Sequence, residues 1–247
     1  MFAELVVVDV SMPIFGALGL AVFLGTILQR LAGQGFGMIA APIAALVAPQ
    51  HLPATILLLG IVVGASALSM DLKAVSWKEA APGFFGRALG AFAGAGIAAA
   101  ISAQSGFGVL VGALILFAVG LSASGLHLPI TNRNLFLAGT TAGVMGTVVA
   151  VGAPPMAILY ANEDPVRSRA MQNLFYAWGM VWSVSALLIA GLIDVSDVLL
   201  TLALVPIAVS ALFLSRPMAH WAAAWPMKPI ALSIAGLAAI MLIGRSI

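Results

Sequence analysis

The sequence predicts an all-α, polytopic membrane protein. Of its 247 residues, 63% are hydrophobic and only 7% are charged, against roughly 45–50% and 25% in a typical soluble domain. The apolar residues form continuous runs of about 15 to 23 residues, long enough for membrane helices, rather than the short alternating stretches of a transmembrane barrel. Because peptide groups must pair with one another in lipid, we expect these runs to be helical.

Glycine, proline and charged residues divide the chain into ten apolar segments. The second, sixth and seventh segments are shorter than the ~20 residues of a full crossing, and each lies beside a glycine-rich break. We therefore expect two broken helical hairpins that enter the membrane and return. The expected ranges are 12–30, 35–49, 53–70, 82–101, 106–123, 135–149, 152–161, 169–192, 197–214 and 229–245.

The basic residues indicate the orientation of the chain. If successive segments alternate in direction, nine of the ten basic residues fall on one side, which the positive-inside rule makes cytoplasmic. Both termini and the acidic loop around Asp194 and Asp197 are then expected on the periplasmic side. The nine residues are Arg30, Lys73, Lys78, Arg87, Arg133, Arg167, Arg169, Arg216 and Lys228.

The two halves of the chain contain similar glycine-rich stretches. Residues 24–26 and 32–37 with Pro42 in the first half correspond to residues 138–140 and 143–155 in the second. Each half holds five segments, so the second half must enter the membrane from the opposite side. The sequence thus predicts one membrane domain with two inverted-topology repeats, 1–123 and 124–247. In such folds the broken helices meet near the midplane, and their N-termini suit an anion.

The candidate substrate-binding residues lie at or near these breaks. Each also has a plainer interpretation: close helix packing for the glycines, capping for the threonines and Gln34, and an interhelical polar contact for the amide pair in the eighth segment. Arg87 can either snorkel to the headgroups or turn inward to an anion. The candidates are Gly33, Gln34, Gly35, Gly37, Thr55, Arg87, Thr147, Gly152, Gln172 and Asn173.

Other chemistries find little support in the sequence. There is no cysteine, and His51, His127 and His220 fall in expected loops without metal-ligand spacing, so we expect neither a metal site nor a cofactor. The segments carry no acidic residue well inside, and the scattered charges suit no nucleic acid. The small-residue face around residues 90–96, which contains three glycines, could serve either a homodimer or internal packing.

At these motifs the sequence resembles the TauE/SafE family of membrane permeases, also called the sulfite exporter family. The resemblance rests on Gly33–Gly37 with Pro42, on residues 53–55 and on residues 143–155, although Gln34, Phe36 and Ala153 stand where glycine is common in the family. It implies a secondary transporter, expected to be an exporter, that moves sulfite, a sulfonate or a related organic anion such as a carboxylate by alternating access. It also implies the bacterial inner membrane and no enzymatic activity.

Two other function classes remain open from the sequence. A membrane-embedded enzyme acting on a lipid-like substrate would be indicated by Asp71, Glu79, Glu163 and Asp164 clustered around a cytoplasmic cavity. A scaffold subunit that transports nothing would show tightly packed hairpins without a polar cavity.

Overall fold

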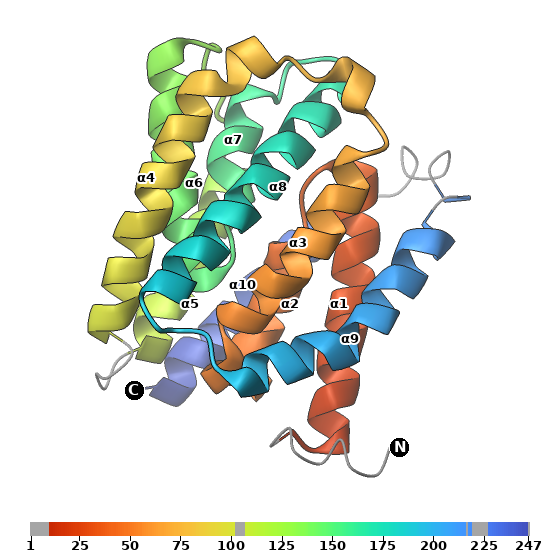
Figure 1. Ribbon diagram of the computed structural model, residues 1–247, viewed down its shortest axis with the longest axis vertical. Coiled ribbons are helices and arrows are strands. Elements are labelled where there is room, and N and C mark those ends of the chain that lie inside the picture. Colours follow the sequence, from red (N-terminus) through yellow and green to blue (C-terminus); the bar gives the residue numbers. More distant parts are fainter. Residues whose placement is uncertain (1–9, 102–106, 216, 219–226, 247) are drawn as a thin grey trace.

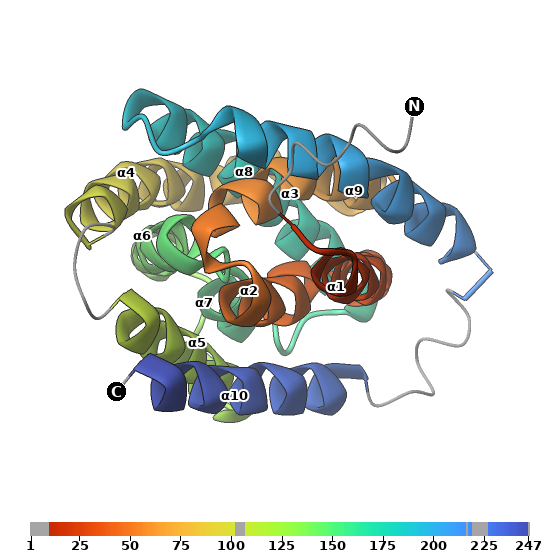
Figure 2. The same ribbon diagram turned by 90° about the horizontal axis from the view of Figure 1, so that it is seen from below.

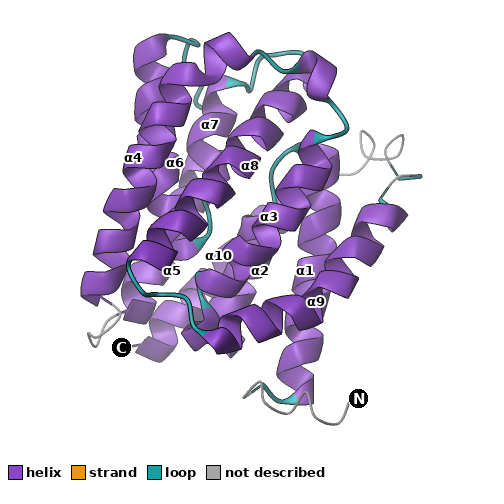
Figure 3. Cartoon of the chain, viewed as in Figure 1, coloured by secondary structure: helices purple, strands orange, loops and turns teal. Residues whose placement is uncertain are grey.

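The protein is an assembly of α-helices, seen in a computed structural model that describes residues 10–101, 107–215, 217–218 and 227–246. Within these ranges every regular element is helical, and one α-helix coincides with each of the ten expected segments (Figures 1 and 3). The prediction of an all-α fold is therefore confirmed. The helices are α1 (Met12–Ala32), α2 (Phe36–Val47), α3 (Ala54–Leu68), α4 (Trp77–Ile101), α5 (Phe107–Ala123), α6 (Asn132–Val149), α7 (Ala153–Leu159), α8 (Pro165–Ile189), α9 (Val195–Leu214) and α10 (Met227–Ser246), with short 3₁₀ helices η2 (Pro49–His51) and η3 (Leu72–Ala74).

Several helices have the length and composition of membrane spans. In the described part of the chain, α1, α4, α9 and residues 229–246 of α10 are long and apolar enough to cross a bilayer. At 1.5 Å per residue, a helix of about 20 residues covers the ~30 Å hydrocarbon layer. Helices α2 and α3, by contrast, have 12 and 15 residues. The chain is thus a polytopic membrane protein in which short helices are packed among long ones.

The two expected breaks occur where the backbone leaves the helical region. The first lies between α1 and α2, where Gly33 has φ 75° and Gly35 has φ 137°, values that glycine adopts without steric cost. The second lies between α6 and α7, where Ala150 has φ 57° and the prolines at 154 and 155 stand in the first turn of α7. Each break turns the chain back, so α1 packs against α2 and α6 against α7.

Three layers of helices surround these breaks (Figure 2). Helices α1, α2, α6 and α7 form the central layer. Helices α3, α4, α8 and α9 cover one face of it, and α5 and α10 pack together over the other. The two breaks therefore lie inside the protein, where their unpaired peptide groups are kept away from lipid.

The packing partners of the first half are repeated in the second half. Helix α1 packs against α9 as α6 packs against α4, and α2 packs against α10 as α7 packs against α5. Helices α3 and α8, which are counterparts, contact each other. Helices α1 and α6 also run in opposite directions in Figure 1. This is the arrangement that an inverted repeat would produce.

Glycines allow α4 and α6 to pack backbone to backbone. A β-carbon at Gly86 would overlap the carbonyl oxygen of Phe136, and one at Gly90 would overlap the carbonyl oxygen of Thr140. Gly94 faces α6 in the same way, whereas Gly96 faces open space. Two of the three glycines that could have served a dimer therefore serve internal packing.

The two ends of the molecule differ in charge. Helix η3 and the starts of α4, α6 and α8 lie at the upper end of Figure 1 and contain Lys73, Lys78, Arg133 and Arg167. We call this the basic end. The starts of α1 and α9 and the end of α10 lie at the lower, opposite end.

Candidate functional site

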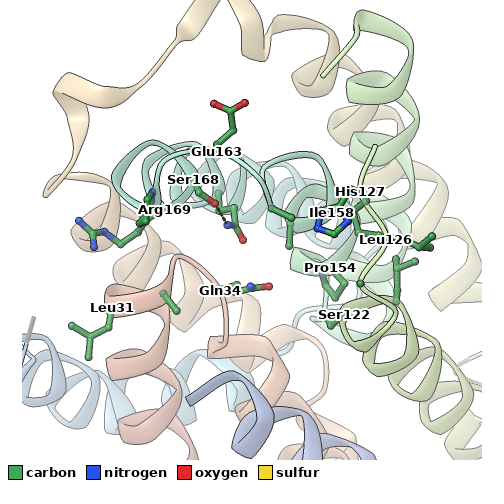
Figure 4. Close-up of a pocket in the computed structure, with 17 residues that line it drawn as sticks. Leu31, Gln34, Ser122, Leu126, His127, Pro154, Ile158, Glu163, Ser168 and Arg169 are labelled. Carbon is green, nitrogen blue, oxygen red and sulfur yellow. Dashed lines mark hydrogen bonds between the residues drawn. The ribbon is translucent and has the colours of Figure 1, made fainter. Parts of the chain in front are cut away.

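A polar cavity of about 490 Å³ opens at the basic end. It lies between the end of α1, the chain after α5, helix α7 and the start of α8 (Figure 4). Gln34, Ser122, Ser168 and Gln172 contribute polar groups to its lining. We call this cavity the vestibule.

Arg87 in α4 lies deeper in the protein and is enclosed by glycines. A β-carbon at Gly146 would lie 2.5 Å from its Nη1 atom, one at Gly152 would lie 2.8 Å from the same atom, and one at Gly179 would overlap Nε. These glycines come from α6, from the second break and from α8. Only 2% of Arg87 is exposed, so the side chain turns inward, and the alternative that it snorkels to the headgroups is wrong.

In the described part of the chain, the charge of Arg87 is not balanced by an acidic residue. Among the described residues, no carboxylate forms an ion pair with it, and Nη1 is buried without a hydrogen-bond partner. A small space of about 10 Å³ adjoins the side chain and is also lined by Gln172 and Tyr176. The hydroxyl of Tyr176 and Oε1 of Gln172 are likewise buried without partners. A buried cation with unsatisfied polar neighbours is a site that an anion would complete.

The two breaks meet at one point. A β-carbon at Gly37, in the first turn of α2, would overlap the carbonyl oxygen of Ala150, and Val151 Cα would be 3.6 Å away. The first break thus contacts the second break. The second break contains Gly152, which forms part of the wall of the Arg87 site. Breaks that lie more than a hundred residues apart in the chain form one structure.

A comparison with protein families identifies the chain. A family model described as sulfite exporter TauE/SafE matches residues 18–242, which include both breaks and Arg87. The chain belongs to the TauE/SafE family. The resemblance that the glycine motifs carry is confirmed, and the family makes membrane transport the function class of this chain. No curated protein and no solved structure matches the chain.

Gln29 holds the first break of this TauE/SafE protein together. Its Nε2 atom donates to the carbonyl oxygen of Gly33 at 2.9 Å and to Oδ1 of Asn173 at 3.0 Å, and its Oε1 atom accepts from the backbone N–H of Phe36 at 3.3 Å. Asn173 is therefore a partner of the break, and its Nδ2 atom is buried without a partner. Gln29 is not among the candidates from the sequence, because its position beside the break is the only feature of the sequence that indicates this role.

The remaining candidates lie in three different places. Gln34 and Gln172 line the vestibule, and Gln172 also borders the space beside Arg87. Thr147 is fully buried and forms a hydrogen bond of 2.8 Å with Ser183. Thr55 lies elsewhere: its hydroxyl donates to the backbone carbonyl of Asp197 at 3.4 Å.

At the opposite end, a buried pair of titratable residues escaped sequence analysis. Nδ1 of His51 lies 2.8 Å from Oδ1 of Asp197, and the two residues are only 5% and 4% exposed. The sequence predicts an acidic loop on the periplasmic side around Asp197; in the structure this residue lies in the first turn of α9 and is buried against His51. The spacing of Asp194 and Asp197 is that of a capping box, which the structure contains at the start of α9. The spacing of these two aspartates is the feature of the sequence that could have indicated the site.

The acidic residues at the basic end are bound to arginines or cap a helix. Arg167 pairs with Glu79 at 2.6 Å and with Glu163 at 2.8 Å, Arg169 pairs with Asp71 at 2.6 Å, and Asp164 caps α8. In the loop after α7, burial raises the pKa of the Tyr160 hydroxyl, which therefore stays protonated and donates to Glu79 at 2.9 Å. Of the four acidic residues only Glu163 lines the vestibule. The cluster that would indicate an enzyme is not formed.

Proposed function

We propose that this TauE/SafE protein is a secondary transporter of a small sulfur-containing or organic anion, such as sulfite or a sulfonate, and that it works by alternating access. The observation that carries the proposal is that Arg87 is buried in a pocket built from glycines and has no carboxylate partner within the part of the chain that the structure describes. An anion bound there would supply the missing negative charge.

The energetics favour an anion as the substrate. A buried charge without a partner is costly, by several kcal/mol after relaxation. Opposite unit charges about 4 Å apart attract by roughly 4 kcal/mol at an effective dielectric constant of 20. The guanidinium group also offers a planar fork of donors that matches two oxygens of a sulfonate, sulfite or carboxylate group. A cation would meet the like charge of Arg87 in the same place.

The vestibule supports an entry route from the basic end. Gln172 borders both the vestibule and the space beside Arg87. That inner space, about 10 Å³, has room for about one water molecule, so the pocket must widen when the anion enters. The anion would pass Gln172, displace the side chains around it and pair with Arg87. Movement of the helices that carry Gly152 and Gly179 would then expose the site to the other side.

The positive-inside rule supports the orientation. The basic end carries Lys73, Lys78, Arg133 and Arg167, so we place it in the cytoplasm and both termini in the periplasm of a bacterial inner membrane. An anion that enters the vestibule from the cytoplasm and leaves at the opposite end is exported.

The other function classes receive less support. A scaffold needs no polar cavity, whereas the vestibule measures about 490 Å³ and has amide and hydroxyl groups in its wall. The four acidic residues that would indicate an enzyme do not gather in that cavity, and Glu163, the one of the four that lines it, is held by Arg167 at 2.8 Å.

Anion uptake into proteoliposomes tests the proposal. Labelled sulfite, sulfoacetate and a carboxylate are compared for the unaltered protein and for Arg87→Met. Arg133→Met serves as the matched control because Arg133 is exposed at the start of α6. We expect saturable flux of at least one of these anions that is lost in Arg87→Met and kept in the control. Gln34→Ala and Gly152→Leu should also lower it, because they alter the vestibule and the wall of the Arg87 site. Full flux in Arg87→Met would contradict the proposal.

A further inference from the structure

The pair His51 and Asp197 joins the two halves of the chain at the end opposite the vestibule. His51 lies in η2, at the α2–α3 junction, and Asp197 lies in the first turn of α9. Figures 1 and 2 show these two segments side by side at that end. The hydroxyl of Thr55, at the start of α3, donates to the backbone carbonyl of Asp197 at 3.4 Å. Contacts from the first half of the chain thus converge on one residue of the second half.

Both carboxylate oxygens of Asp197 have polar partners. Oδ2 accepts the backbone N–H of Asp194 at 3.0 Å, and Oδ1 lies 2.8 Å from Nδ1 of His51. The carboxylate also stands in the first turn of a 20-residue helix, where the helix dipole favours a negative charge. Both oxygens are therefore engaged, which leaves the imidazole of His51 as the group of the pair that is open to a further proton.

His51 has a free position for that proton. Its Nε2 atom is buried and has no hydrogen-bond partner. With a neutral imidazole, which donates from Nδ1, the buried pair carries a net charge of −1, and burying a net charge is costly. With one proton added at Nε2, the pair becomes an imidazolium and a carboxylate with no net charge and a charge-assisted hydrogen bond.

Few other charges face the pair. The described helices that pack against η2 and α9 are α1, α2 and α3. Helices α2 and α3 contain no titratable residue, and the one in α1 is Arg30, in its last turn, which donates to Ser66 at 3.2 Å. Among the described residues directly before α9, Asp194, the N-cap of this helix, also carries a titratable group.

We propose that His51 and Asp197 form a proton-binding latch that holds the end opposite the vestibule closed. The inference rests on the alternating-access function proposed above, which requires this end to open. When this end opens, water solvates both groups, and the added proton then stabilises the pair less than it does in the closed arrangement. The closed arrangement consequently binds the proton more tightly than the open one, and proton binding shifts the population toward the closed arrangement. Loss of the proton favours opening.

Cysteine labelling of the full-length protein in detergent tests the latch directly, because the native chain has no cysteine. Ala54→Cys places a thiol at a position that is 3% exposed, next to Thr55. Val195→Cys, at a position that is 75% exposed at the start of α9, corrects for the dependence of thiol reactivity on pH. Relative to that control, we expect Cys labelling at position 54 with a maleimide to be at least fivefold faster at pH 8 than at pH 5.5.

His51→Gln and Asp197→Asn should remove this pH response, while His127→Gln, in an exposed loop at the basic end, should keep it. Thermal melting of each variant checks that it is folded. A ratio that does not change with pH, an absence of labelling at both pH values, or a full response in folded His51→Gln and Asp197→Asn would overturn the latch.

Anion flux measured on the same proteins separates the two proposals. A pH response in labelling without any anion flux would contradict the transport function and leave the latch standing. Anion flux that depends on Arg87, together with a labelling rate that does not change with pH, would contradict the latch alone.

Discussion

The guanidinium group of Arg87 lies directly against the backbone of Gly179, so closely that a β-carbon at position 179 would overlap Nε. The two residues come from α4 and α8, which belong to different halves of the chain. Glycine at 179 is what lets a long cationic side chain occupy the centre of a helical membrane protein. The position of the charge therefore depends on the absence of one methyl group.

Gly179→Ala should displace the guanidinium group without removing its charge. We expect kcat/KM for anion uptake to fall at least tenfold, equivalent to about 1.4 kcal/mol, with the protein still folded. Gly96→Ala is the matched control, because a β-carbon there meets no other atom within 4 Å. Uptake by Gly179→Ala at the level of this control would show that the position of Arg87 does not matter.

Arg87→Met should leave the empty protein at least as stable as the unaltered one. The substitution replaces a buried cation that lacks a counter-ion with an apolar side chain, a change that is often neutral or stabilising. In the unaltered protein, an anion at 100 times its Kd should raise the free energy of unfolding by about 2.7 kcal/mol. This increase should be absent in Arg87→Met. Thermal melting in detergent with and without sulfite measures both effects. A variant that melts several degrees lower without anion would assign Arg87 a structural role instead.

Gln29→Leu should destabilise the first break. The change leaves the N–H of Phe36, the carbonyl of Gly33 and Oδ1 of Asn173 without the partner that each has now. Because each of the three unsatisfied buried groups costs about 1–3 kcal/mol, we expect a loss of at least about 3 kcal/mol in the free energy of unfolding. Denaturation followed by circular dichroism measures it. Gln50→Leu makes the same chemical change at an exposed position and should have little effect; equal stability of the two variants would refute the bracing role.

Gly37→Ala should weaken the contact between the two breaks. The added methyl group would overlap the carbonyl oxygen of Ala150, a backbone atom that cannot rotate away. Overpacking of this kind costs about 1–3 kcal/mol, so the melting temperature should drop. Gly120→Ala, where a β-carbon meets nothing within 4 Å, should be neutral or slightly stabilising, since alanine favours a helix over glycine by about 1 kcal/mol. If Gly37→Ala and Gly120→Ala melt at the same temperature, the contact between the two breaks does not contribute to stability.

The positions of the helices and the breaks follow from local properties of the chain. Apolar runs of sufficient length become helices because lipid offers no partner for peptide groups. The glycines at 33 and 35 and the prolines at 154 and 155 interrupt the helices where they stand, because φ and the N–H group are properties of single residues. For that reason the ten segments, the two hairpins and the family resemblance were all available from the sequence.

The site depended on contacts between distant residues. Sequence analysis left open whether Arg87 faces the headgroups or the interior, because a residue about five positions into the expected segment 82–101 can reach either. The structure decides this through glycines at 146, 152 and 179, none of which adjoins Arg87 in the chain. Hydropathy alone could not identify them, since a glycine that packs helices and a glycine that makes room for a side chain look alike.

The chain by itself therefore determined that this is a helical membrane protein of the TauE/SafE family with two broken hairpins and one basic end. Only the tertiary structure decided that Arg87 is buried without a carboxylate partner among the described residues, that Gly37 meets Ala150, and that His51 pairs with Asp197 across a separation of 146 residues. The physical reason is that hydropathy and backbone preference act within a few residues. Burial and pairing of charges depend instead on which helix faces pack together.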